Sequence, residues 1–577
     1  MPITLPKNSP NSGPSGWLAG WLLRGLLTLL CLLLALPVWG VLGAWLALDA
    51  SSLAVLRHQW ATVLPGYAAQ SALLAGGVGV GVVLLGSALA AAVTLFDFRG
   101  RRTLEWALLL PLAMPAYVLA YAWTDALQYS GPLQTGLRAA TGWQGALWPD
   151  VRTLPGAVVL FVLCLYPYVY LLARAALGER AVQMMEAARL LGAPLRRRVL
   201  EVALPMARPA IAAGAALALM ETLADYGVGA YFGLTTLSTG IYKAWLVLGD
   251  AMAAAQLASV LLLLVAALLT AERAAQRGRR FVAARGAGMQ SAEARPVALR
   301  GTVGAAVLVL CLLPVLLGFV LPVAWLARLL WQEATLSEFG LPWARFAQWA
   351  GTSFLLAAAA AVAATLLALA LGHALRQGRV TGPHPGSRLG LGLGLGLGHH
   401  ALLRPAARVL SLGYAVPGVV VALGILLPVG WVQSHWPQWG AAALVTGTVF
   451  GLLYAYLVRF SAVAMQSVDA GYARVPVSVD DTARMLGSRP LRVFARLHLP
   501  LLRRSALAAA LLVFVDVMKE LPATLLLRPF GSDTLAVVAY NFARDERLAE
   551  AALPSLAIVL VGLLPVILLS RAVRQPA

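Results

Sequence analysis

The sequence has few charged residues. Of its 577 residues, 12% are Asp, Glu, Lys or Arg and 60% are hydrophobic, with a mean hydropathy of +0.80. Soluble globular proteins carry about 25% charged residues, so the composition excludes a protein that meets water on all sides, as well as a disordered chain. Since a membrane-spanning helix needs about 20 apolar residues, we expect an all-α polytopic membrane protein.

Cysteine is also scarce. The three cysteines lie inside apolar runs and lack the spacing of metal ligands, at Cys31, Cys164 and Cys311. This excludes a disulfide-stapled secreted domain and a cysteine metal site. We expect these side chains to be buried or to face lipid, and we assign no metal ligand.

The sequence has three lysines, none of them in a phosphate-binding loop. Such a loop ends in Gly-Lys-Ser/Thr, whereas Lys7, Lys243 and Lys519 follow Pro, Tyr and Met. No nucleophile and general base stand out either. We therefore expect no catalytic residue and no cofactor bound by this chain.

Long apolar runs predict about twelve membrane-spanning segments. They lie near 17–48, 70–96, 105–125, 155–177, 203–222, 251–271, 301–330, 350–375, 405–430, 440–460, 503–521 and 551–570. The first run is too long for a removable signal peptide, so we expect it to stay as an anchor after a disordered tail, 1–16.

Basic residues predict the orientation. Lys and Arg number 44 against 24 Asp and Glu, a net charge of +20, and most of them fall in alternate loops, such as 174–208 and 459–504. Cytoplasmic loops are enriched in Lys and Arg, so the pattern predicts cytoplasmic N- and C-termini. Because the basic excess follows the topology, it indicates contact with a lipid bilayer and not with nucleic acid.

The segments divide the chain into two halves. In order, the predicted parts are a first half 17–271 with its core at about 66–271, a cytoplasmic linker 272–300, and a second half 301–577 with its core at about 350–571 and a low-complexity cytoplasmic loop 378–400.

The two halves share a pattern at an offset of 295 residues (481 minus 186). Its positions are Glu186, Ala187, Ala188, Gly192 and Pro205 in the first half, and Asp481, Ala483, Gly487 and Pro500 in the second. The pattern predicts a short amphipathic helix that ends at the glycine, then a span that begins at the proline.

A single copy of this pattern would fit a helix that rests on lipid headgroups. Two copies with the same internal spacing favour a docking device. Upstream, Met114-Pro115 resembles Val416-Pro417, so the repeat continues into the spans. The repeat is parallel, and its two halves are expected to enclose one central path.

The repeated Glu-Ala-Ala…Gly…Leu-Pro pattern resembles the coupling loop of bacterial ABC importer permeases of the type I class, which have a MetI-like fold. The resemblance implies an inner-membrane permease with both halves in one chain. It also implies two copies of a separate cytoplasmic ATPase that uses ATP and Mg, and a periplasmic solute-binding protein. Asp481 and Thr482 depart from the Glu-Ala of the pattern, which implies weaker docking of the second copy.

Two further segments, Glu221–Gly227 and Lys519–Pro529, resemble ferric iron permeases. This resemblance implies import of Fe(III) from an iron-binding protein. Thiamine permeases share the architecture and give an alternative substrate. A secondary transporter driven by an ion gradient is a further alternative, although a repeated docking motif has no role in one.

Four acidic residues follow the same repeat. Glu221 and Asp225 lie four apart, and adding 295 gives Asp516 and Glu520, with Lys519 between them. Acids within a membrane are costly and usually face a wet interior, so these residues predict a cation path or gate. Alternatively, they cap helix ends, pair with Lys519 or Lys243, or lie in water.

Overall fold

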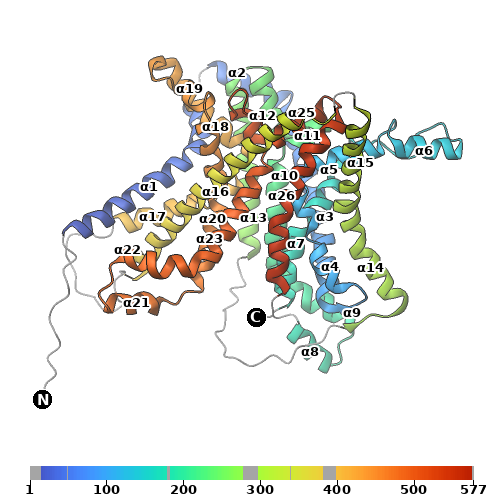
Figure 1. Ribbon diagram of the computed structural model, residues 1–577, viewed down its shortest axis with the longest axis horizontal. Coiled ribbons are helices and arrows are strands. Elements are labelled where there is room, and N and C mark those ends of the chain that lie inside the picture. Colours follow the sequence, from blue (N-terminus) through green and yellow to red (C-terminus); the bar gives the residue numbers. More distant parts are fainter. Residues whose placement is uncertain are drawn as a thin grey trace.

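The computed structural model describes residues 14–47, 50–178, 182–276, 297–337, 340–380 and 398–574. In these ranges the chain is helical apart from loops and one parallel pair of short strands, β1 (Phe96–Asp97) and β2 (Val297–Ala298) (Figure 1). The predicted all-α architecture is confirmed.

The first-half helices are α1 (Pro14–Gly43), α2 (Ala50–Ala61), α3 (Leu64–Leu95), α4 (Arg101–Ala107), α5 (Ala116–Leu127), α6 (Pro132–Thr141), α7 (Leu154–Ala176), α8 (Val182–Leu190), α9 (Leu195–Arg197), α10 (Leu204–Ala224), α11 (Gly227–Tyr231), α12 (Leu237–Tyr242) and α13 (Ala251–Gln276). Those of the second half are α14 (Gly301–Val315), α15 (Leu321–Leu336), α16 (Trp343–Val380), α17 (Gly398–Leu410), α18 (Gly418–His435), α19 (Ala441–Thr446), α20 (Phe450–Ala473), α21 (Val477–Met485), α22 (Pro490–Val493), α23 (Leu499–Met518), α24 (Pro522–Leu527), α25 (Leu535–Arg544) and α26 (Leu548–Arg574).

Within the described ranges, 9 helices are long and apolar enough to cross a membrane, or up to 11 when each of two bent pairs is taken as one span. The sequence predicts about twelve. The predicted span 503–521 corresponds to α23, in which Arg503, Arg504 and Asp516 make the helix too charged to qualify.

Two predicted spans are interrupted at matching prolines. The run 105–125 breaks after a 3-10 turn, and α5 then begins beyond Pro115; the run 405–430 breaks in the same way, and α18 begins beyond Pro417. A residue before proline avoids the helical region, and Met114 and Val416 are accordingly extended. The breaks place four helix ends inside the bundle.

The two halves are interlocked. Helix α1 packs against α17 and α18 of the second half, and α14–α15 pack against α3, α4 and α5 of the first. The backbones of α1 and α18 approach each other closely. A Cβ added to Gly424 would lie only 1.9 Å from the Pro37 carbonyl oxygen. One buried apolar cluster accordingly includes residues of both halves.

The predicted tail, linker and low-complexity loop lie mostly outside the described residues. Helix α1 begins at Pro14, within the predicted tail 1–16. Helix α13 continues to Gln276, past the predicted start of the linker at 272, and β2 lies within its end. Helix α16 continues to Val380, and α17 begins at Gly398, so both enter the predicted loop 378–400.

Candidate translocation cavity and coupling segments

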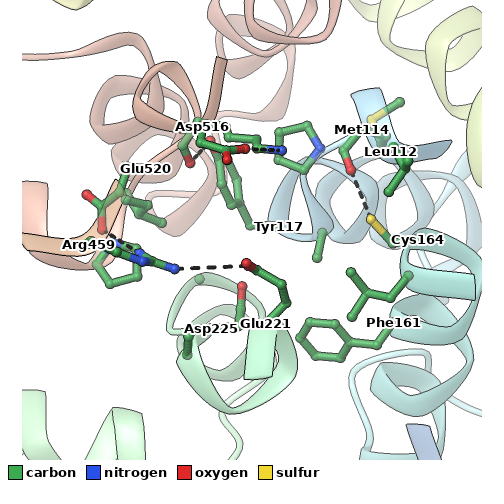
Figure 2. A pocket seen from close by; sticks show the side chains of 18 of the residues that line it. Leu112, Met114, Tyr117, Phe161, Cys164, Glu221, Asp225, Arg459, Asp516 and Glu520 are labelled. Atoms are coloured by element: carbon green, nitrogen blue, oxygen red, sulfur yellow. Dashed lines mark hydrogen bonds and ion pairs between the residues drawn. The ribbon is translucent and has the colours of Figure 1, made fainter. Parts of the chain in front are cut away.

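The predicted acids meet at a cavity between the two halves. The cavity has a volume of about 110 Å³ and is lined by the beginning of α5 and by parts of α7, α10, α20 and α23 (Figure 2). Its lining includes all five predicted residues, Glu221, Asp225, Asp516, Lys519 and Glu520. The structure therefore brings together acids that are about 295 residues apart in the sequence.

Arg459 joins the acids of the two halves. Its Nη1 lies 3.0 Å from Glu520 Oε1, and its Nη2 lies 4.0 Å from Glu221 Oε2 (Figure 2). The side chain is 8% exposed, and its Nε has no hydrogen-bond partner among the described residues. The sequence reading missed this residue and placed it at the start of a basic cytoplasmic loop; it lies inside α20, which continues to Ala473.

Two acids cap the short helices that follow them. Glu520 accepts hydrogen bonds from the backbone N–H groups of Ala523 (2.9 Å) and Thr524 (3.0 Å), at the start of α24. Asp225 accepts one from the Val228 N–H (2.8 Å), at the start of α11. The capping alternative is thus observed at both positions, and each cap fixes a carboxylate beside the cavity.

The fourth acid is paired with lysine. Asp516 Oδ1 lies 3.1 Å from Lys519 Nζ, and their side chains are 19% and 28% exposed. The pairing with Lys519 considered from the sequence is therefore present. The position 295 residues before Lys519 is Ala224, so both cations of the cavity belong to the second half, whereas the acids come from both halves.

The arrangement is an ion-pair network and not a preformed metal site. Among the described residues, no group of three His, Cys, Asp or Glu side chains is placed to hold a metal ion. The cysteines are buried, as predicted, and Cys164 at the cavity donates a hydrogen bond to the Met114 carbonyl at 2.9 Å.

The repeated pattern at Glu186–Gly192 and Asp481–Gly487 forms two matching helix ends. Helices α8 and α21 end two residues before Gly192 and Gly487, whose φ values are +80° and +74°. In each case the glycine N–H and the next N–H bond back to carbonyls of the preceding turn. The predicted glycine stop is confirmed, because this left-handed backbone favours glycine over residues with a Cβ.

Both helices present an acid and two apolar side chains to their surroundings. Glu186 and Asp481 are exposed. Four apolar side chains at the two helix ends are 79–89% exposed, at Leu190, Leu191, Met485 and Leu486. Of the alanines in the pattern, Ala187 is exposed, Ala188 is half-buried and Ala483 is buried. Figure 1 shows α8 and α21 at the same edge of the molecule.

The two prolines begin helices, as predicted, because Pro205 and Pro500 lie in the first turn of α10 and α23. Each of these two helices continues directly from a short helix before it, α9 in the first half and α22 in the second. A π-helical segment precedes each proline, Arg198–Ala203 and Phe494–His498. Proline has no N–H to donate to the carbonyl four residues earlier, so a wider turn continues the helix where a regular one would lose a bond.

Comparison with known proteins agrees with this architecture. A family described as the binding-protein-dependent transport system inner membrane component matches residues 82–280 and 388–575. The chain belongs to this family. Its members are non-catalytic, multi-pass inner-membrane components that work with an ATPase and a solute-binding protein, and they carry no cofactor. The two matched regions correspond to the two halves of a duplicated MetI-like permease.

Individual relatives differ in what their names say they transport. The Fe(3+)-transport system permease protein FbpB 2 of Haemophilus influenzae is 24% identical over 497 residues, which cover 86% of this chain and 87% of the relative. The putative 2-aminoethylphosphonate transport system permease protein PhnV of Salmonella typhimurium is 30% identical over 167 residues, 29% of this chain and 60% of the relative. PhnU of Salmonella choleraesuis, named for the same system, is 25% identical over 198 residues, 34% of this chain and 69% of the relative.

Proposed function

We propose that this chain is the fused permease of an ATP-driven importer that moves Fe(III) from a periplasmic binding protein into the cytoplasm. The observation that carries the proposal is the cavity between the halves, where four carboxyl groups outnumber two cations. Oxygen ligands suit a hard cation. The likeness to a Fe(3+)-transport permease over 86% of this chain supports the same substrate.

A phosphonate is the second candidate substrate. Arg459 and Lys519 line the cavity and could attract its anionic group, and two relatives are named for 2-aminoethylphosphonate transport. Both cations, however, are within 3.1 Å of a carboxylate, Glu520 or Asp516. A phosphonate would have to displace these carboxylates, so the cavity favours a cation. Thiamine, suggested by the shared architecture, has no separate support from the side chains at the cavity.

In this proposal α8 and α21 dock two copies of the ATPase. Their shared edge, matching glycine stops and exposed apolar ends support this role. Asp481 keeps a carboxylate at the position of Glu186. Helix α1 begins toward that edge and helix α26 ends toward it, which supports cytoplasmic N- and C-termini (Figure 1).

Arg459 and the acids act as the gate of the path. Arg459 holds Glu520 of its own half at 3.0 Å and Glu221 of the other half at 4.0 Å. Because the second contact is longer and crosses between halves, separation of the halves breaks it first. Glu221 and Asp225 then face the open path, while Glu520 stays with Arg459.

Uptake by reconstituted vesicles tests the substrate. Vesicles that contain this chain with its ATPase are supplied with the binding protein loaded with ⁵⁵Fe(III), with and without ATP. We expect iron uptake that depends on ATP and on the binding protein. Uptake of labelled 2-aminoethylphosphonate or thiamine without uptake of iron would refute the iron assignment and leave the importer architecture intact.

A further inference from the structure

A buried polar cluster fixes α21, the second of the two proposed docking helices, to the membrane-spanning helices. Asp480 in α21 and His498 at the end of the π-helical segment before α23 are 5% and 2% exposed. His498 Nε2 lies 2.7 Å from Asp480 Oδ1, and the Nε and Nη2 atoms of Arg376 lie 2.7 and 2.6 Å from Asp480 Oδ2. Hydrogen bonds to a buried carboxylate of this kind are among the strongest in proteins.

Arg376 extends the cluster to a third helix. This residue lies near the end of α16, and its side chain is 11% exposed. It donates hydrogen bonds of 2.9–3.1 Å to backbone carbonyls at the end of α20 and in the turn before α21, those of Tyr472, Val475 and Pro476. One guanidinium therefore holds the end of α20 and, through Asp480, the beginning of α21.

The cluster also leads to the cavity. His498 directly precedes α23, a helix of 20 residues, which is about 30 Å long at the usual rise per residue. The far end of α23 carries Asp516 and is followed by Lys519 and Glu520, which line the cavity. Asp480 is thus bonded to the base of the helix whose other end forms the ion-pair network.

The first half is built differently at the same places. Subtracting 295 from Asp480 and His498 gives Met185 and Ala203, which are 6% and 0% exposed. Both belong to one buried apolar cluster. An apolar contact is non-directional and tolerates sliding, whereas a charged hydrogen bond keeps its partners in register.

We propose that Asp480 is a positioning residue that locks α21 to α16 and α23, so that a displacement of α21 by the ATPase moves the cavity end of α23. The inference rests on the proposed docking role of α21. It assigns the firm transmission of that movement to the second half, and a looser, packed contact to the first.

Three variants test the lock in vesicles that contain the complete complex and the ⁵⁵Fe(III)-loaded binding protein. Asp480→Asn keeps the volume but removes the charge, so ATPase co-purification and ATP hydrolysis should persist while iron uptake per ATP falls about five-fold or more. Asp480→Glu keeps the carboxylate, and an adjoining cavity of about 70 Å³ accommodates the longer side chain. We expect it to transport within about two-fold of the wild type. The matched control is Asp97→Asn, at a carboxylate whose side chain is 64% exposed.

Wild-type uptake per ATP in Asp480→Asn would overturn the inference. An equal loss in Asp480→Asn and Asp480→Glu would overturn it as well, because a shape effect would then explain both. The docking role is checked separately: unchanged ATPase binding in Glu186→Lys and Asp481→Lys would refute it whatever Asp480→Asn does. If the wild-type complex imports 2-aminoethylphosphonate in place of iron, the same ratio measured with that compound decides the inference.

Discussion

At the scale of residues, the two carboxylates bound to Arg459 are held with different firmness. Glu520 has a side chain 1% exposed and accepts three hydrogen bonds from the start of α24, whereas Glu221 is 27% exposed and 4.0 Å from Arg459. We expect Glu520→Gln to lower the free energy of unfolding by roughly 3 kcal/mol, because it leaves a buried guanidinium without its nearest charge. Glu221→Gln should cost about 1 kcal/mol or less. Thermal unfolding in detergent measures the difference.

Among correctly folded molecules, iron uptake should depend more on Glu221 than on Glu520, the reverse of their ranking by stability. Since Glu221 faces the cavity and crosses between halves, Glu221→Gln combined with Asp225→Asn should be expressed normally and still lose iron uptake. Wild-type uptake by this double variant would show that these acids are ordinary buried polar groups with no part in the path. Equal melting temperatures for Glu520→Gln and Glu221→Gln would contradict the ranking by burial.

The glycine stops of the coupling segments permit a second prediction about residues. A Cβ at Gly192 or Gly487 would meet no atom within 4 Å, so substitution there costs only backbone strain. For a β-branched residue at positive φ the cost is roughly 1–2 kcal/mol, enough to redirect the end of α8 or α21. Valine at either position should reduce ATPase co-purification without loss of folded protein. Gly136→Ala in α6, also in open space, is the control and should change neither.

At the scale of elements, the crossing of α1 and α18 depends on close backbone approach. A Cβ on Gly424 of α18 would lie 1.9 Å from the carbonyl oxygen of Pro37 in α1, whereas one on Gly25, which also belongs to α1, would meet nothing within 4 Å. Gly424→Ala should therefore separate the helices and lower the melting temperature, with a cost of about 1–3 kcal/mol. Gly25→Ala should be neutral. Unchanged melting of Gly424→Ala would show that α1 is held elsewhere.

The elements that the sequence predicts best are those whose signal is local. Long apolar runs mark the spans, and the two glycine stops follow from the chain itself. The breaks at Pro115 and Pro417 also have a local signal, a proline inside an apolar run, but a run is read as one span unless the proline is given weight. The prolines locate the starts of α10 and α23, but the sequence does not predict the π-helical segments that join these helices to the short helices before them.

The cavity was only half predictable for a different reason. The acids of the cavity can be found through the internal repeat. Arg459 at the cavity and Asp480 in α21, however, have no charged counterpart in the first half, and their roles depend on partners distant in the sequence. Arg459 meets Glu520 across 61 residues and Asp480 meets Arg376 across 104. A single arginine beside an apolar run is read as the start of a loop, and only tertiary packing shows that α20 continues beyond it.

At the scale of the whole molecule, the parallel repeat gives two exposed helix ends, the proposed docking surfaces, that are similar but not identical. Helices α8 and α21 lie at one edge, and each exposes an acid near an apolar helix end (Figure 1). The second copy has Asp481 and Thr482 where the first has Glu186 and Ala187. If each surface holds one ATPase, removing a single acid should weaken one site while the other still binds.

Charge reversal tests this arrangement on the intact complex. Glu186→Lys and Asp481→Lys place a cation on an exposed surface, so the fold should be unaffected while the local docking contact turns repulsive. We expect the mass of the detergent-solubilised complex to fall from two ATPase copies toward one in each single variant, more completely for Glu186→Lys, and toward none in the double variant. If the two surfaces bind independently, the loss in the double variant should equal the sum of the two single losses. Retention of two ATPase copies by the double variant would show that docking depends on surfaces other than α8 and α21.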